Sequence, residues 1–166
     1  MKRKNKHQNV PFRITKNKVF AYGIMATAVA AIGYFGWYAM IPANGTFPVF
    51  APRDNHFIKA LHSTSGYQYV SISSGSVKGL RSSGGGGIIN PEYVFTKGDV
   101  QSIHFINEDR ETHSHHNLNI DAFNVHTRDL NYYESQTIDF IPDKAGTFEY
   151  YCSIHPEMKG EITVLG

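Results

Sequence analysis

The sequence contains very little cysteine: one residue, Cys152, in a chain of 166. A single cysteine excludes an internal disulfide framework, a cysteine-ligated iron–sulfur cluster and a zinc site built from several cysteines. The length also excludes a large multidomain enzyme, and it suits one domain with a short extension. Fifteen Gly, ten Tyr and eleven Phe favour β structure over a helical bundle.

Acidic residues are missing from the N-terminal quarter of the chain. Residues 1–42 carry seven Lys and Arg and no acid, whereas residues 43–166 carry nine Lys and Arg against fourteen Asp and Glu, a net charge of −5. Nucleic-acid binding needs a cationic face that displaces phosphate counterions. We therefore expect no nucleic-acid partner.

Charged residues of either sign are missing from residues 19–41, which form an apolar run of 23 positions. A bilayer core of ~30 Å needs about 20 such residues in a helix, so this run predicts a single transmembrane helix or signal anchor. Because residues 1–18 hold seven cations, the positive-inside rule predicts a basic cytoplasmic tail and an extracytoplasmic C-terminal domain. The alternative is a cleaved signal peptide ending near Ile41-Pro42-Ala43, although its apolar core would normally be shorter.

Residues 42–55 contain three prolines and predict a semi-rigid linker. Its Asn44-Gly45-Thr46 sequence matches a glycosylation sequon, for which plain linker is the simpler interpretation. Residues 56–166 contain short alternating segments separated by turns and predict an all-β domain, a sandwich or barrel, with a flexible loop at residues 82–87. The expected strands are 67–73, 93–96, 100–107, 118–123, 136–140, 147–152 and 161–165.

The chemistry-bearing residues gather near the C-terminus, where Cys152, His155 and Met158 have the spacing C-x2-H-x2-M. Strand alternation places Phe148, Tyr150 and Cys152 on one face, so the cysteine ends an inward-facing row and the loop after it can return His155 and Met158 to the same point. A thiolate, an imidazole and a thioether suit copper much better than Mg²⁺ or Ca²⁺, which prefer oxygen.

A mononuclear copper site of this type needs a second histidine, and the run at residues 113–116 offers His113, His115 and His116. We select His116, because it stands at the start of the next strand and Asn117 beside it can hydrogen-bond across to the cysteine loop. His113 and His115 are interpreted as solvated loop residues, with an accessory copper or zinc site as the minority alternative.

These residues resemble the cupredoxin family, in particular the small plastocyanin/amicyanin-like blue (type 1) copper proteins. The resemblance covers roughly residues 90–164 and includes the His116-Asn117 pair, the approach to Cys152 and the short loop to Met158. It implies an antiparallel Greek-key β-sandwich and one copper ion. The ligands that it implies are His116, Cys152, His155 and Met158.

The sequence therefore predicts a membrane-anchored blue copper protein that carries single electrons between redox proteins at the membrane surface, and not an enzyme. We expect Phe148, Tyr150 and Ile154 to shield the thiolate, His155 to be the electron's exit, and the acidic domain to favour a partner with a positive rim. The alternatives are a copper storage or delivery protein, and an accessory copper subunit of a membrane oxidase.

Overall fold

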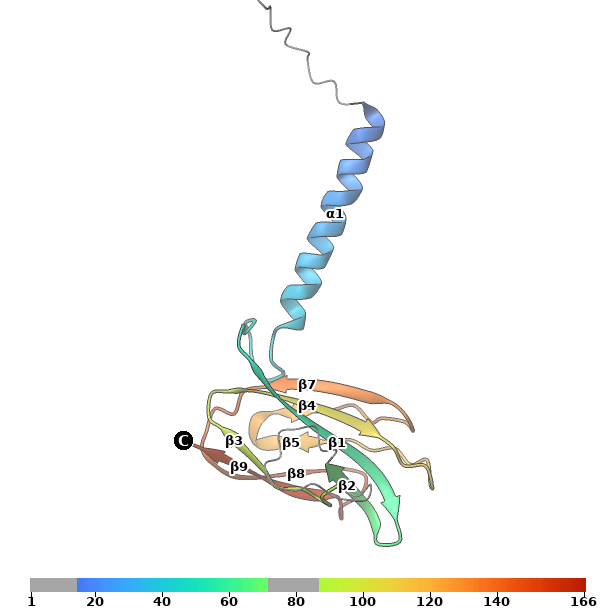
Figure 1. Cartoon of the computed structure of the whole chain (residues 1–166), viewed down its shortest axis with the longest axis vertical. Helices are drawn as coiled ribbons and strands as arrows, with labels where there is room; N and C mark the ends of the chain where they lie inside the picture. Colours follow the sequence, from blue (N-terminus) through green and yellow to red (C-terminus); the bar gives the residue numbers. More distant parts are fainter. Residues whose placement is uncertain (1–14, 72–86) are drawn as a thin grey trace, which may run out of the picture. The chain divides into compact units, whose positions relative to one another are not determined.

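The computed structural model describes residues 15–71 and 87–166 (Figure 1). Backbone contacts divide the chain after Ala39 into a helical unit and a β unit, residues 40–166, here called the β-domain. Most of the expected basic tail and most of the expected loop at residues 82–87 lie outside the described residues.

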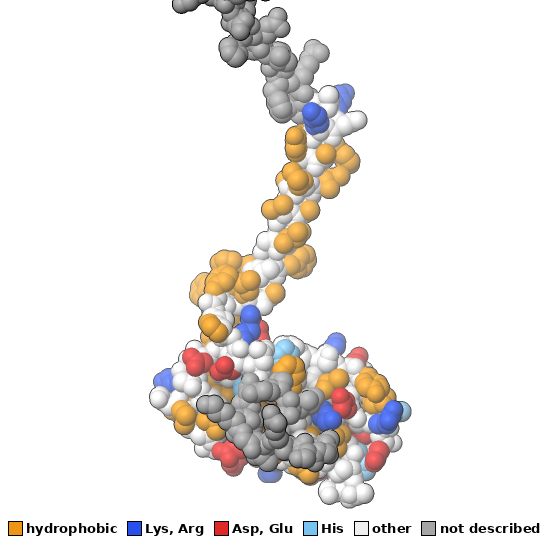
Figure 2. Space-filling view, viewed as in Figure 1, with side chains coloured by type: hydrophobic (Ala, Val, Ile, Leu, Met, Phe, Trp, Pro, Cys, Tyr) orange, Lys and Arg blue, Asp and Glu red, His pale blue; other side chains and the backbone are white. Residues whose placement is uncertain are grey.

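The helical unit consists of one helix, α1 (Lys16–Ala39), whose 24 residues span about 36 Å at 1.5 Å per residue. Its only charged residues are Lys16 and Lys18 in the first turn, and none of its residues is buried in the molecule. Hydrophobic side chains occur along the face of the helix that is visible in Figure 2. The helix is therefore long and apolar enough to be a membrane span, and a signal sequence would meet the same criterion.

The β-domain contains two sheets, whose strand orders are β2-β1-β4-β7 and β3-β9-β8-β5-β6. The first sheet is built from β1 (Arg53–Ser63), β2 (Gly66–Ser71), β4 (Val100–Asn107) and β7 (Ser135–Phe140). The second is built from β3 (Tyr93–Thr96), β5 (Asn119–Ile120), β6 (Val125–His126), β8 (Gly146–Tyr151) and β9 (Lys159–Leu165).

One hydrophobic core joins the two sheets. Tyr69 of β2 packs against Tyr150 of β8 with ring centroids 5.4 Å apart, and Phe95 of β3 packs against Phe140 of β7 at 5.9 Å. All four rings are buried because alternate residues of each strand face the other sheet. The expectation of an all-β sandwich is confirmed.

Both sheets are mixed rather than purely antiparallel. Strand β1 runs parallel to β4, and β3 runs parallel to β9, while the other strand pairs in the described residues are antiparallel. Parallel neighbours cannot be joined by a tight hairpin, so each pair is connected through other strands of the domain. The resemblance stated above implied an antiparallel sandwich, and these two parallel pairings differ from that expectation.

Local differences from the sequence prediction are concentrated at two points. Strand β1 begins at Arg53, inside the residues expected to form the linker, and it is the longest strand described. The strand expected at 118–123 is reduced to the two residues of β5, because a 3-10 turn (Asp121–Phe123) follows and ends with Asn124 in the left-handed conformation.

Candidate metal centre

Strand β8 brings the cysteine to the centre of the site. Tyr150 and Cys152 are buried and Phe148 packs against the core, so the inward-facing row expected from strand alternation is confirmed. Cys152 lies just beyond the last residue of β8, where the chain leaves the sheet and turns into the loop at residues 152–158. The strand therefore delivers the thiol at the edge of the core, with 1% of the residue exposed.

The loop at residues 152–158 is closed by its own backbone. The Cys152 amide donates to the Met158 carbonyl at 3.0 Å, and the Met158 amide donates to the His155 carbonyl at 3.0 Å. Cys152 and Met158 are both buried, whereas His155 is half-buried. Ile154, which the sequence predicted to shield the thiol, is 41% exposed.

His116 reaches the same point from the middle of the chain. A two-way backbone bridge to Leu130 fixes it, with N–O distances of 3.1 and 2.8 Å, and the residue is fully buried. His116, Cys152 and His155 each offer one ligand atom, and these three atoms lie within 4.8 Å of one another. The Cys152 Sγ lies 3.9 Å from the His155 Nδ1.

The other two histidines of the run at residues 113–116 do not join this group. Both His113 and His115 are exposed, and the His113 ring stacks on Tyr132 with centroids 4.3 Å apart. Within residues 15–71 and 87–166, no second cluster of metal-ligating side chains accompanies them.

Asn117 fastens the two halves of the site together. Its side-chain oxygen accepts the Ser153 amide at 2.8 Å, and its side-chain nitrogen donates to the Ser153 hydroxyl at 2.7 Å. The hydrogen-bonded clamp between the His116 segment and the cysteine loop, expected from the sequence, is confirmed. The buried Tyr69 hydroxyl donates to the Asn117 backbone carbonyl and anchors the clamp in the core.

A buried carboxylate, Asp109, fixes the orientation of the His116 ring. The His116 Nε2 lies 3.3 Å from the Asp109 Oδ2, and both side chains are fully buried. Burial alone would raise the pKa of Asp109, but hydrogen bonds from Thr112, His116 and Ser114 outweigh it and lower the pKa to about 2. The carboxylate is therefore charged at neutral pH, and it holds Nε2 as the donor nitrogen of His116.

The opposite ring nitrogen, His116 Nδ1, is then the one left available to a metal ion. It is buried and has no hydrogen-bond partner among the residues that the structure describes. Burial lowers the pKa of His116, and burial likewise lowers the pKa of His155, so both imidazoles favour the neutral form that can bind a metal. A buried nitrogen without a hydrogen-bond partner lowers the stability of the fold unless a ligand binds to it.

Tyr67 of β2 forms a lid over the two histidines. Its ring centroid lies 3.8 Å from that of His155 and 5.5 Å from that of His116, and its hydroxyl lies 3.1 Å from the Ser114 hydroxyl. The sequence analysis missed this residue and Asp109. The alternation Tyr67-Gln68-Tyr69 indicates that the two tyrosines share a face, which was the available signal for Tyr67.

The donor set defines what the site can hold. A thiol and two imidazoles come together beyond the end of β8, Met158 is buried where the same loop closes, and soft donors of this kind select copper over Mg²⁺ or Ca²⁺. The residues thus fit one soft or borderline metal ion, and an oxygen-preferring ion does not fit.

Comparison with known proteins identified a family model described as the cupredoxin-like domain, which matches residues 87–164. A search of curated proteins found no match. Among solved structures, dithionite-reduced auracyanin from the photosynthetic bacterium Roseiflexus castenholzii is 18% identical, with a TM-score of 0.47 over 70% of this chain and 100% of that chain.

Two further solved structures are similar over parts of the chain. A reduced amicyanin variant is 25% identical, with a TM-score of 0.33, over 46% of this chain and 70% of that chain. The copper nitrite reductase from Nitrosomonas europaea is 19% identical, with a TM-score of 0.45, over 68% of this chain and 41% of that chain.

Proposed function

We propose, from the premise that residues 87–164 are a cupredoxin-like domain, that this protein is a membrane-anchored blue copper protein that carries single electrons. The observation that carries the proposal is the preset group of His116, Cys152 and His155, whose ligand atoms lie within 4.8 Å of one another. The unpaired, buried His116 Nδ1 supports it, because a metal ion would satisfy that nitrogen.

The proposed ligands are His116, Cys152, His155 and Met158, which would hold one type 1 copper ion. Bound copper supplies the one-electron couple between Cu(I) and Cu(II). The protein holds these donor atoms in fixed positions. Asp109 orients His116, and the Asn117 clamp fixes the cysteine loop. The backbone hydrogen bond between Cys152 and Met158 closes that loop. Little reorganisation then opposes electron transfer.

His155 is the proposed exit of the electron, since it is half-buried while the other three proposed ligands are buried. Exposed Ile154 and Pro156 flank it and provide a small apolar contact for a partner. The net charge of −5 on residues 43–166 favours a redox partner with a positive rim. Anchoring by α1, with the N-terminus in the cytoplasm, would keep the domain close to membrane-bound partners.

The test is a visible spectrum of the full chain, purified in detergent and loaded with Cu(II). We expect an intense thiolate-to-copper band that a reductant bleaches and that Cys152→Ser abolishes. His116→Ala should also abolish it, whereas the matched variant His115→Ala should keep it, because His115 is exposed outside the group. A colourless wild-type protein would contradict the proposal.

Two further measurements separate this function from copper delivery and from enzyme activity. An electron carrier should keep its copper through repeated oxidation and reduction, whereas a delivery protein should release Cu(I) to a competing acceptor. Four protein ligands leave no open position for a substrate, so we expect no steady-state turnover with a small molecule as sole substrate.

A further inference from the structure

Residues 40–50, here called the anchor loop, form a closed loop within the β-domain. The Val49 amide donates to the Met40 carbonyl at 2.9 Å, so the chain returns to the residue that directly follows α1. The side chains of Phe47 and Phe50 are 74% and 77% exposed, more than any other large hydrophobic residue that the structure describes. No charged residue occurs between Val19 and Pro52.

The anchor loop is fixed to the β-domain by hydrogen bonds at the end of β7. The Asn44 side chain donates to the Ile141 carbonyl at 2.7 Å and accepts the Ile141 amide at 3.0 Å, while the Ala43 amide donates to the Asp139 carbonyl at 2.6 Å. The Asn44 side-chain amide is thus hydrogen-bonded within the fold. This agrees with the interpretation of residues 44–46 as plain linker rather than as a glycosylation site. A loop held in this way presents its two phenylalanines in a defined place.

We propose that the anchor loop lies in the lipid interface and that Phe47 and Phe50 insert between the lipid headgroups. The inference rests on the proposed membrane anchoring. If α1 spans the bilayer, its last residue, Ala39, lies near the surface, and the Val49–Met40 bond holds Val49 and its neighbour Phe50 at the same level. Uncharged, aromatic-tipped segments are stabilised at this boundary, where exposed rings leave water.

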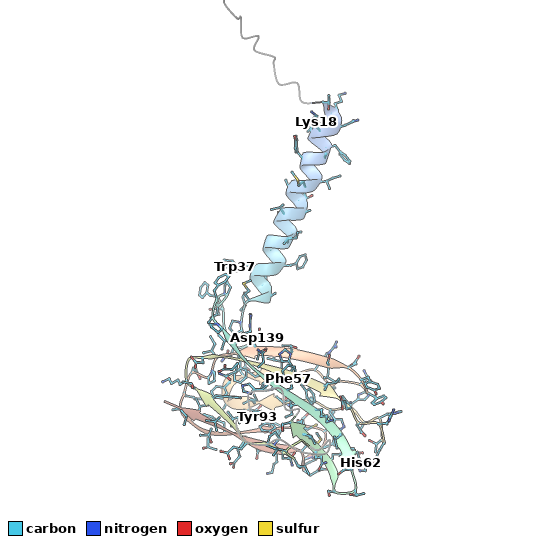
Figure 3. The ribbon with its side chains drawn as sticks, in the orientation of Figure 1. Lys18, Trp37, Phe57, His62, Tyr93 and Asp139 are labelled. Atoms are coloured by element: carbon cyan, nitrogen blue, oxygen red, sulfur yellow. The ribbon has the colours of Figure 1, made fainter. Side chains whose placement is uncertain are left out.

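This placement sets the metal centre at the end of the β-domain that is remote from lipid. Strand β1 starts at Arg53, which pairs with Asp139 beside the anchor loop at 2.9 Å, and after eleven residues it ends at Ser63. His62 near the end of β1 and Tyr67 at the start of β2 pack their rings together, and the Tyr67 ring also packs on that of His155 in the site. Figure 3 shows Asp139 and His62 at opposite ends of the β-domain.

The test uses tryptophan fluorescence of the full chain in phosphatidylcholine vesicles with brominated acyl chains, which quench tryptophan on contact. Trp37 is the only tryptophan, so Trp37→Phe provides a silent background. In the Trp37→Phe protein, the fluorescence of the added Phe47→Trp variant should lie at a shorter wavelength than that of tryptophan in water. Brominated lipid should quench this fluorescence strongly relative to unbrominated lipid. The control is Val94→Trp, at an exposed position on β3, which should stay unquenched.

The outcomes distinguish this proposal from its premises. If the chain floats with the vesicles but Phe47→Trp behaves like Val94→Trp, lipid insertion of the loop is overturned while anchoring stands. If the chain does not float with vesicles, anchoring and insertion both fail. Loss of the copper band in the same samples would overturn the proposed function but not the insertion of the loop. If Phe47→Trp disturbs the loop, Phe50→Trp serves as the second reporter.

Discussion

At the scale of single residues, the orientation of His116 depends on a carboxylate behind the ring. The Asp109 side chain is fully buried and lies 3.3 Å from His116 Nε2, which leaves Nδ1 available to a metal ion. We expect Asp109→Asn to weaken copper binding by about 10- to 100-fold, the usual cost of losing such a partner. The measurement is competition for copper against a chelator of known affinity.

Glu111→Gln is the matched control for Asp109→Asn. Glu111 is an exposed carboxylate of the same loop and pairs with His62 at 2.9 Å rather than with a proposed ligand. Its substitution should leave copper affinity unchanged. Equal affinities for the Asp109→Asn protein and the wild type would show that the carboxylate does not position the ligand.

The sequence predicted that His116, Cys152 and His155 lie together, but it did not predict the buried residue Asp109 that orients His116. The spacing from Cys152 to Met158 identified three of the candidates, and Asn117 was identified as the clamp because it adjoins His116. Asp109 gave no such signal, since it lies in the charged stretch Glu108-Asp109-Arg110-Glu111, which is typical of a solvated turn. Its burial depends on hydrogen bonds from a loop whose path the sequence does not specify.

At the scale of elements, the least predictable strand is β1, which forms a hairpin with β2. Strand β1 mixes polar and apolar residues on both faces and begins in a segment that resembles a linker. Its parallel pairing with β4 joins segments more than 40 residues apart, and no local pattern specifies such a contact. The later strands were predictable because their alternation and turn residues are regular.

The hairpin matters because it carries Tyr67 over His155. We expect Tyr67→Ala to uncover that imidazole and to speed the removal of Cu(I) by a specific chelator, because water and the chelator gain access to one face of the ring. Tyr67→Phe keeps the ring and loses only the contact with the Ser114 hydroxyl, so its rate should stay close to the wild type. Equal rates for Tyr67→Ala and the wild type would mean that the ring does not protect the site.

At the scale of the whole molecule, one buried and two half-buried histidines make the stability of the copper-free protein depend on pH. Burial lowers the pKa of His56 below its ordinary value of 6.5, and the same holds for His116 and His155. The unfolded chain therefore takes up protons near pH 6.5 while the folded chain does not, and the free energy of unfolding should fall as the pH drops below that value.

The share of His56 in this pH dependence can be measured separately, because it lies on β1, away from the proposed ligands. Denaturant unfolding of the copper-free protein at pH 7.5 and 5 should show a smaller loss of stability for His56→Gln than for the wild type. His115→Gln, at an exposed position, serves as the control. An unchanged loss in His56→Gln would contradict the assignment.

The position of β9 in its sheet has a consequence for the order of synthesis. This strand, the final one described, lies between β3 and β8, so the second sheet is incomplete until residues 159–165 have emerged. Tyr150 and Cys152 belong to β8 and its end, and they lack their neighbour until then. A nascent chain therefore has no complete site for a metal ion before β9 is made, and we expect metal binding to follow the synthesis of residues 159–165.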